Sequence, residues 1–380
     1  MSNDAGNRNI IVFGDDWQSH ISTTQHLINH LDGNHRIIWI DSIGMRSPEL
    51  SFYDLTRVAR KALRLISSSK NKQHVHKQQS LIEHVQPKVL PWHSIRFVNN
   101  YNRRYINRLI DQLIEKHNFF EPVILASNPV VALYLNEQHC HSLTYLRLDD
   151  YEKYGGVDPE LAIHSEQRML SRAKMVFYTA QSLKPENAMN SRYLPQGVDV
   201  ENFKLLPPCK SENKTLGFFG LMEPSRYDFE LIIEVAKLNP DWVLEFIGPM
   251  TYVPDTFKSV DNIRLLPAVD YQQLSEATTH WSLAWIPYRV NDLTRSINPL
   301  KLREYLSLGH KVMTTELPEV KAIDADISII ESALEATQIM QNLPAESDLI
   351  REFRHKAMHQ HSWVNRSQEL IDYLPHLHAV

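Results

Sequence analysis

The residues with the clearest potential for chemistry are Lys301 and Glu304, a cation and a carboxylate in a predicted helix over residues 299–308. Their spacing of three places both side chains on one helical face near the N-terminus. A helix N-terminus offers unpaired N–H groups and a partial positive charge, to which phosphate oxygens bind. Lys301 adds a full charge to the same anion, and Glu304 can accept hydrogen bonds from a sugar diol. The pair suits a nucleoside diphosphate with its ribose; the alternative is an ordinary charge pair on a surface helix.

The ends of this helix are predicted from residue type. Asn298 is expected as the N-cap and Pro299 as the first helical residue, because their side chains favour those positions. Gly309 is expected to end the helix. We therefore expect the segment to be a loop that opens directly into the helix.

Length and composition exclude several classes of protein. A chain of 380 residues is too long for one ordinary hydrophobic core, so two domains are expected. No apolar run reaches the roughly 20 residues of a transmembrane helix, and the polar N-terminus lacks the apolar region of a signal peptide. Cys140 and Cys209 are the only cysteines, which supports neither a disulfide framework nor a cysteine metal site. We expect a cytoplasmic protein.

The charge is unevenly distributed along the chain, although its net value is only −5. Residues 1–195 carry 23 Lys/Arg and 19 Asp/Glu, whereas residues 196–380 carry 17 and 26. Within residues 46–108 there are 13 basic and 3 acidic residues. Such a local field favours an anionic partner: phospholipid, lipid-linked phosphate or nucleic acid.

Strand and helix patterns alternate in both halves of the chain. Residues 10–14, 22–31 and 36–40 read as strand, helix and strand, and 215–219, 228–238 and 243–247 repeat that order. Residues 195–213 have the turn chemistry of an interdomain linker. The alternation predicts two doubly wound, Rossmann-like α/β domains that face a cleft. Their predicted bounds are 1–195 and 196–362, with a C-terminal helix at about 363–380 that packs back on the first domain.

Several short segments occur in an order and spacing typical of one family. They are residues 194–203 (LPQGVDVENF), 218–221 (FFGL), 246–249 (FIGP), 262–267 (NIRLLP), 299–309 (PLKLREYLSLG), 314–320 (TTELPEV) and 361–363 (HSW). In them the chain resembles the GT-B-fold nucleotide-sugar glycosyltransferases, of the group 1-like type. It most resembles the bacterial group that builds exopolysaccharides and teichuronic-acid-like polymers. The first 140 residues match only in outline.

The resemblance implies that the C-terminal domain binds the sugar nucleotide. Glu304 would receive the ribose hydroxyls, and Lys301 would neutralise the pyrophosphate. Gly220 would let the backbone approach the diphosphate, because a Cβ there would hold it away. The remaining donor-binding residues implied by the resemblance are Arg226 for phosphate, Pro267 and Tyr271 beside the base, Tyr288 near the sugar or phosphates, Gly248 and Asn298.

One position departs from the family pattern. Many relatives have two glutamates separated by seven residues, the first of them near the donor sugar. Here the second is Glu304, but the first position holds Ser296. This departure leaves the donor sugar and the stereochemical outcome open.

A transferase of this kind that inverts the anomeric centre also needs a base for the acceptor hydroxyl. Asp149 and Asp150 follow a predicted strand at 143–148, and ligands gather outside the carboxyl ends of strands in such folds. The alternative is a pair of loop or capping carboxylates. His20 is the rival base, and Gly14 and Trp17 are expected on the acceptor side or at domain closure, although a plain turn glycine also explains Gly14. Helix dipole and basic side chains can stabilise the leaving diphosphate, so no metal or other cofactor is expected.

The basic region contains cations at helical spacing. They are Arg57, Arg60, Lys61 and Arg64, and Arg103 and Arg104 continue the charge. A basic amphipathic helix there could rest on an anionic membrane and present a lipid-linked acceptor. The alternative is a solvated helix face. Nucleic-acid binding is not expected, because no aromatic-interleaved basic motif accompanies the charge.

The sequence thus predicts a metal-independent glycosyltransferase. Its donor would be a nucleoside diphosphate-sugar, with a UDP-sugar favoured, and its acceptor a saccharide or lipid-linked saccharide in cell-surface polysaccharide synthesis. It would work in the cytoplasm, peripherally on the inner face of the cytoplasmic membrane. Two alternatives stay open: a nucleotide-sugar epimerase on the same fold, and a non-catalytic nucleotide-sugar-binding subunit.

Overall fold

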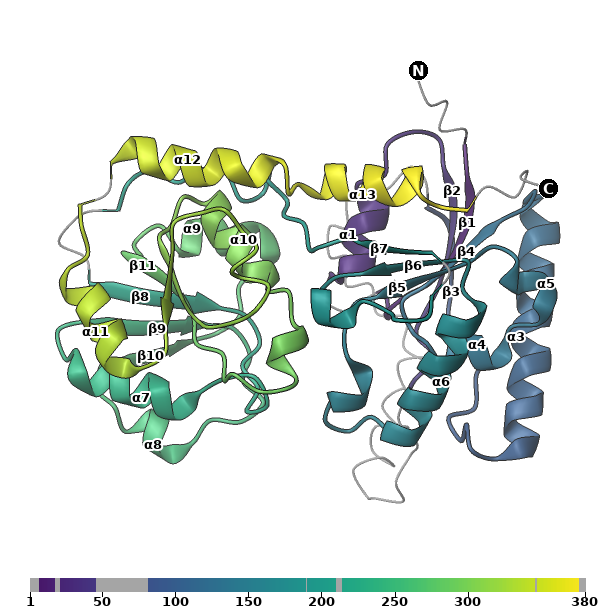
Figure 1. Cartoon of the computed structure of the whole chain (residues 1–380), viewed down its shortest axis with the longest axis horizontal. Coiled ribbons are helices and arrows are strands. Elements are labelled where there is room, and N and C mark those ends of the chain that lie inside the picture. Colours follow the sequence, from purple (N-terminus) through teal and green to yellow (C-terminus); the bar gives the residue numbers. More distant parts are fainter. Residues whose placement is uncertain are drawn as a thin grey trace. The chain divides into compact units, whose positions relative to one another are not determined.

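The computed structural model describes residues 7–17, 21–45, 81–188, 190–209, 214–345 and 347–375. They form two compact units, labelled by element in Figure 1. Unit 1 contains the described residues up to Tyr178, Leu183–Leu194 and those from Ser367 onward. Unit 2 contains Thr179–Ser182 and Pro195–Arg366. Each unit holds one parallel sheet with helices, so the predicted pair of doubly wound α/β folds is confirmed.

Unit 1 is built on a seven-stranded parallel sheet in the order β3-β2-β1-β4-β5-β6-β7. The strands are β1 (Asn9–Phe13), β2 (Arg36–Ile40), β3 (Leu81–Val85), β4 (Val123–Ala126), β5 (Leu143–Arg147), β6 (Met175–Tyr178) and β7 (Ser191–Tyr193). In the central β1, Phe13 pairs with Ile40 of β2 and Ala126 of β4. The central strands are apolar and almost wholly buried, as expected where helices cover both faces.

The helices of unit 1 lie on both faces of this sheet. They are α1 (Thr23–Asn29), α3 (Arg96–His117), α4 (Val131–Tyr134), α5 (Glu137–Cys140), α6 (Pro159–Arg172) and the 3-10 turns η1 (Tyr151–Lys153) and η2 (Gln181–Leu183), the last of which begins in unit 2. Helix α4 contacts both α3 and α6, so these three form one layer. The end of α13 (Trp363–Asp372) packs on α1, where the Ser367 hydroxyl donates to the Leu27 carbonyl at 2.6 Å.

Unit 2 has a six-stranded parallel sheet in the order β10-β9-β8-β11-β12-β13. The strands are β8 (Thr215–Phe219), β9 (Val243–Ile247), β10 (Ile263–Leu266), β11 (Leu283–Ile286), β12 (Val312–Thr315) and β13 (Ile327–Ile330). The helices are α7 (Phe229–Leu238), α8 (Asp255–Lys258), α9 (Leu274–Ala277), α10 (Leu300–Ser307), α11 (Ala333–Gln341) and α12 (Asp348–His359), with 3-10 turns η3 (Tyr271–Gln273) and η4 (Thr294–Ser296). Its core is rich in aromatic rings, among them Phe218, Trp281 and Tyr305.

The segment predicted as a linker is part of unit 2 as far as residue 209. Val198 forms a bridge with Ser362, and Phe203 is completely buried. The Ser307 hydroxyl donates to the Phe203 carbonyl at 2.6 Å. The turn-forming residues correctly indicated irregular structure in this segment. Buried apolar contacts, however, attach the segment to unit 2.

The chain passes between the units at 178/179, 182/183, 194/195 and 366/367. The last passage lies inside α13, which begins in unit 2 and ends in unit 1. Trp363 at its start packs against Gly197, where an added Cβ would lie 2.5 Å from the indole. In the part of the chain that the structure describes, no helix is both long and apolar enough to cross a membrane.

Candidate functional site

The candidate site lies in unit 2, where β8 and β9 end and α10 begins. Gly220 follows β8 with φ +133°, and Gly248 follows β9 with φ +135°, a conformation that favours glycine. A Cβ on Gly248 would lie 2.4 Å from the Gly220 carbonyl oxygen, so the two turns pack backbone against backbone. A Cβ on Gly220 would lie 2.2 Å from Cε and 2.8 Å from Nζ of Lys301. The Lys301 side chain therefore extends from α10 across the Gly220 turn.

Lys301 and Glu304 have no hydrogen-bond or ion-pair partner for their side chains among the described residues. Glu304 is only 4% exposed. Burial is the main reason that its pKa is raised to about 7; nearby Asp199 raises the pKa further, and Lys301 lowers it. A buried carboxyl group without a donor is costly in a folded protein. Unsatisfied groups of opposite charge on one helix face are typical of a site that a ligand completes.

The first turn of α10 differs from the sequence prediction. Pro299 is the N-cap, no side chain caps the helix, and the prediction of Asn298 as N-cap was wrong. The Asn298 amide instead donates to the Thr179 carbonyl at 2.8 Å and to Glu319 at 3.0 Å. Its oxygen accepts from the buried Arg303 at 2.5 Å. Buried Arg303 and Glu319 thus occupy the side chain that would otherwise cap, and the first N–H groups of α10 are left without a side-chain acceptor.

Two of the predicted donor-binding residues have a structural role here. Ser296 is 3% exposed, and its hydroxyl donates to the Leu293 carbonyl at 2.7 Å within its own turn. Tyr288 is also 3% exposed and stacks edge-on against Tyr227, with ring centroids 5.1 Å apart. The Thr315 hydroxyl donates to the Tyr288 carbonyl at 2.6 Å. The structure therefore places both side chains inside the core of unit 2.

Of the other predicted donor-binding residues, only Tyr271 is linked to Glu304 among the described contacts. Tyr271 packs edge-on against Phe203, and its raised pKa, caused mainly by burial, is raised further by the charge of Glu304. Arg226 is half-buried and pairs with Glu223 at 3.4 Å. Pro267 is exposed in the loop after β10. The structure thus brings Tyr271 close to the Glu304 carboxyl group and leaves Pro267 at the surface.

The sequence analysis missed Asp199, although it lies in the matching segment 194–203. Its Oδ1 accepts from the backbone N–H groups of Glu201 and Asn202 at 3.2 and 3.1 Å, which fixes the carboxylate in a turn. From there its charge acts on both Glu304 and Tyr271. An Asp in a turn-forming segment could have indicated this residue. Its distance from residue 304 in the chain concealed the electrostatic interaction with Glu304.

In unit 1, the predicted base candidates follow β5. Asp149 accepts a hydrogen bond from the Tyr154 hydroxyl at 2.8 Å. Asp150 pairs with Lys153 at 2.7 Å. Both are half-buried. Each carboxylate is therefore held by a protein group, Asp149 by a hydroxyl and Asp150 by a lysine.

Gly14 and Trp17 lie beside a buried indole. A Cβ on Gly14 would come within 2.2 Å of the Trp39 ring, so packing requires glycine there. The Trp17 ring meets Trp39 at 4.8 Å, and its backbone N–H donates to Asp41 at 3.0 Å. Arg103 and Arg104 are exposed on α3. The remaining candidates, His20, Arg57, Arg60, Lys61 and Arg64, lie outside the described residues.

Carboxylates that could bind a metal lie away from this site. The chain contains an Asp-x-Asp sequence at Asp324 and Asp326, before β13. Asp326 accepts from Arg354 at 2.5 Å, so one of these carboxylates is already paired. Within the described residues, no three His, Cys, Asp or Glu side chains are grouped closely enough to hold a metal ion.

The fold is the GT-B fold, in which two parallel α/β units are joined in one chain. Anabaena HepE (Alr3699) in complex with UDP-glucose has this architecture, with a TM-score of 0.61 and 12% identity over 96% of this chain and 99% of that one. Sucrose-phosphate synthase from Thermosynechococcus elongatus matches with a TM-score of 0.65 and 10% identity, over 96% of this chain and 97% of that one. These likenesses confirm the predicted fold class.

A sequence relative points the same way. The chain is 31% identical over 113 residues to TuaH of Bacillus subtilis (strain 168), named as a candidate teichuronic acid biosynthesis glycosyltransferase. The match spans 28% of this chain and 28% of TuaH. No family model matches the chain. The predicted resemblance to GT-B nucleotide-sugar glycosyltransferases is thus confirmed by a partial sequence relative and by solved structures of the same fold.

Proposed function

We propose that the protein is a glycosyltransferase whose donor is a nucleoside diphosphate-sugar, with a UDP-sugar favoured. The observation that carries the proposal is the pair Lys301 and Glu304, which share one face of α10 beside Gly220 and have no hydrogen-bond or ion-pair partner among the described residues. HepE, which has the same fold, was crystallised with UDP-glucose. The pair and the fold together support a donor site in unit 2.

The chemistry of the pair matches the two polar parts of such a donor. Lys301 and the uncapped N–H groups of α10 supply positive charge for the diphosphate. The Glu304 carboxylate can accept one hydrogen bond from each ribose hydroxyl, which would satisfy its buried oxygens. Because Gly220 has no side chain, Lys301 can lie across the turn after β8, where we propose that it meets the phosphates.

The proposed reaction needs one bond made and one broken. The acceptor hydroxyl oxygen attacks the anomeric carbon, and the bond from that carbon to the diphosphate oxygen breaks with its electron pair on the diphosphate. Lys301 and the N-terminus of α10 stabilise the departing charge, so the proposal includes no metal. Asp149 or Asp150 accepts the hydroxyl proton as general base.

The proposed acceptor is a saccharide or lipid-linked saccharide in cell-surface polysaccharide synthesis, reached in the cytoplasm at the inner face of the cytoplasmic membrane. The partial relative TuaH is named for teichuronic acid biosynthesis, which supports this class. Helix α3 supports the membrane part, because it carries exposed Arg103 and Arg104 and begins beside Ile95 and Phe97, which are 49% and 79% exposed. Exposed apolar and basic residues on one element suit an anionic membrane surface.

Calorimetric titration with UDP, GDP, UDP-glucose and GDP-mannose tests the donor site. We expect the nucleotides of one nucleobase, uracil or guanine, to bind. Glu304→Ala should weaken that binding by about tenfold or more, because the ribose hydroxyls lose their hydrogen-bond acceptor. Glu234→Ala is the matched control, since Glu234 is exposed on α7. Absence of binding to any of the four nucleotides would contradict the proposal.

Product analysis separates the transferase from its alternatives. Incubation with donor alone should leave the configuration of the donor sugar unchanged at every carbon other than the anomeric one. Transfer should require an acceptor. An epimerised donor without acceptor would identify an epimerase on the same fold. Donor binding without turnover, whatever the acceptor supplied, would identify a non-catalytic binding subunit.

A further inference from the structure

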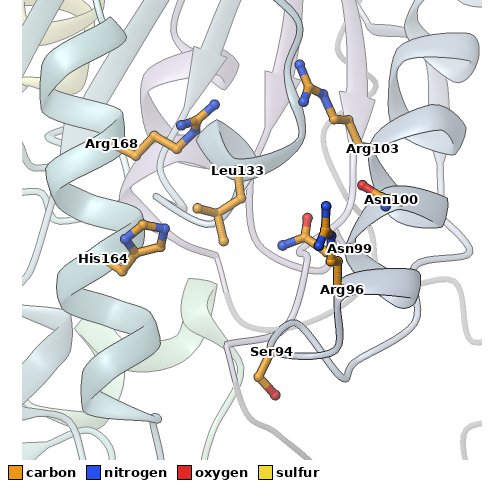
Figure 2. Close-up of a pocket in the computed structure, with 8 residues that line it drawn as sticks. All are labelled: Ser94, Arg96, Asn99, Asn100, Arg103, Leu133, His164 and Arg168. Atoms are coloured by element: carbon orange, nitrogen blue, oxygen red, sulfur yellow. The ribbon is translucent and has the colours of Figure 1, made fainter.

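Unit 1 contains a hollow of about 350 Å³ between α3 and α6, and neither Asp149 nor Asp150 is among the residues that line it (Figure 2). It forms because α4, which lies between those helices in the same layer, is only one turn long. Leu133 of α4 lies between the two sets of polar side chains in Figure 2. A short helix between two long ones leaves a concave surface that side chains from both long helices line.

The lining of this hollow is basic and carries no carboxylate. Arg96 and Arg103 come from α3, and His164 and Arg168 come from α6. Ser94, Asn99 and Asn100 add neutral groups that can donate hydrogen bonds. The lining therefore offers many donors and three permanent positive charges to whatever occupies it.

Arg168 is held in place and still has donors to offer. Its Nε donates to the Ala132 carbonyl at 3.1 Å, and its terminal nitrogens make no hydrogen bond to a described residue. Arg172, one turn later on α6, shows the contrast. Its terminal nitrogens donate to Ala132 and Leu135 carbonyls and to Glu137. Arg172 thus supports α4 and α5, whereas Arg168, which lines the hollow, is fixed at only one nitrogen.

The three arginines lack counter-charges in the part of the chain that the structure describes. No ion pair joins Arg96, Arg103 or Arg168 to a described carboxylate. Like charges gathered around one concave surface repel each other, and a bound anion offsets that repulsion. The planar guanidinium group matches two oxygens of a phosphate at once, which favours this class of anion.

We propose that this hollow binds the phosphate or diphosphate group of a second ligand. Its volume falls in the range of small-molecule sites and admits a diphosphate with an attached group. The site goes beyond the donor site of unit 2, and its existence does not depend on that site. The ligand is either a water-soluble phosphate ester or a phosphate headgroup presented by a membrane.

Titration with inorganic pyrophosphate tests the proposal directly. All proteins carry Lys301→Ala, so that pyrophosphate cannot use the proposed donor site in unit 2. We expect saturable binding at low ionic strength and about tenfold or greater weakening by Arg103→Ala and by Arg168→Gln. Arg108→Ala is the matched control, because Arg108 is another exposed arginine of α3 and does not line the hollow. It should change affinity by less than about twofold.

Thermal unfolding checks that each variant is folded. Arg168→Gln also loses the hydrogen bond to the Ala132 carbonyl and can therefore destabilise the fold. In that case Arg103→Ala, which changes an exposed residue, decides whether the hollow binds pyrophosphate. Absence of saturable binding would overturn the proposal. Equal weakening by Arg103→Ala and Arg108→Ala would overturn it too, because a diffuse surface field and no defined site would then explain the binding.

Two further experiments distinguish a water-soluble phosphate ester from a phosphate headgroup presented by a membrane. One is titration with glucose 1-phosphate; the other is co-sedimentation with phosphatidylcholine vesicles with and without phosphatidic acid. Binding of glucose 1-phosphate that requires Arg103 and Arg168 supports a soluble ligand. Retention only by vesicles with phosphatidic acid, lost in the same variants and kept in Arg108→Ala, supports a headgroup. A parallel titration of UDP-glucose with the wild-type chain and with Lys301→Ala reports on the donor site through the binding that Lys301→Ala removes, so the two proposals can fail separately.

Discussion

Gly14 and Gly220 occupy equivalent places in the two units, yet the structure requires them for different reasons. Each follows the central strand that opens its sheet, β1 in unit 1 and β8 in unit 2. At Gly14 an added Cβ would meet the buried Trp39 ring, whereas at Gly220 it would meet the flexible end of Lys301. Topology therefore fixes where the glycine stands, but the side chain packed against it differs: a buried indole at Gly14 and the Lys301 side chain at Gly220.

The polar residues after the strands show the same difference. In unit 1, Asp149 is held by Tyr154, and Asp41 is held by His84 at 2.7 Å. In unit 2, the Lys301 and Glu304 side chains have no such partner among the described residues. Unit 1 thus presents groups already fixed by the protein, which suits a base of defined position. Unit 2 presents groups that a ligand would satisfy.

The largest expected effect concerns the base in unit 1. Asp149→Asn or Asp150→Asn, whichever removes the base, should lower kcat/KM for transfer by about 10²- to 10⁴-fold, because an amide cannot take the acceptor proton. The affinity for UDP-glucose should stay unchanged, since the donor groups are in unit 2. Kinetics and calorimetry on the same samples check both statements. Full activity in both variants would remove these residues from the mechanism.

The second prediction tests the glycine comparison itself. Gly14→Ala should lower the free energy of unfolding by about 1–3 kcal/mol through overpacking against Trp39, and leave UDP-glucose affinity unchanged. Gly220→Ala should weaken UDP-glucose binding by about tenfold or more, because its Cβ displaces the Lys301 ammonium group. Denaturant unfolding and calorimetry measure the two quantities.

Gly155→Ala is the control for the glycine pair, since no atom lies within 4 Å of its added Cβ. It should change neither quantity. The comparison would be broken if Gly14→Ala reduced binding as much as Gly220→Ala at unchanged stability.

The smallest effect is a pH dependence from Glu304. Its pKa of about 7 leaves part of the population protonated near neutrality, and the ribose diol requires the carboxylate. The affinity for UDP-glucose should therefore fall as the pH drops below 7, by up to about tenfold per unit. UDP-glucose is the suitable probe, because each of its phosphates carries one ester and one anhydride bond and therefore has no group that titrates near pH 7. In Glu304→Gln the affinity should be lower and flat with pH; an unchanged slope would assign the titration to another group.

The same carboxyl group predicts a change in stability of the free protein. Its folded pKa of about 7 lies above the ordinary 4.5, so the folded state binds more protons between these values. Stability should then decrease as the pH rises from 4.5 to 7, by about 3 kcal/mol in total. Glu304→Gln should remove this loss, which thermal unfolding of the free protein at pH 5 and pH 8 would show.

The sequence predicted what depends on local pattern. The alternation of strand and helix predicted both sheets, and the spacing of Lys301 and Glu304 predicted their shared face. It missed α12, because the face that α12 buries includes Arg351 and Arg354, which no apolar pattern indicates. It also missed β3 and β13, edge strands whose residues are largely half-exposed.

The parts of the site that could not be predicted depend on contacts distant in sequence. Asn298 was expected to cap α10, but Thr179 and Glu319 lie 119 and 21 residues away in the chain and hold its amide. Capping preference describes a side chain that is free to turn back on its own helix. A buried arginine that needs an acceptor, here Arg303, outweighs that preference.

The path of α13 has a consequence for protease digestion. A cut within residues 209–214 would divide the chain into two fragments, and the second would carry the end of α13. That end packs in unit 1, where Ser367 donates to Leu27, Glu369 pairs with Arg192 at 3.1 Å and the Arg192 guanidinium lies 3.5 Å from the Tyr373 ring centroid. The nicked protein should therefore migrate as one species under native conditions and as two bands after denaturation.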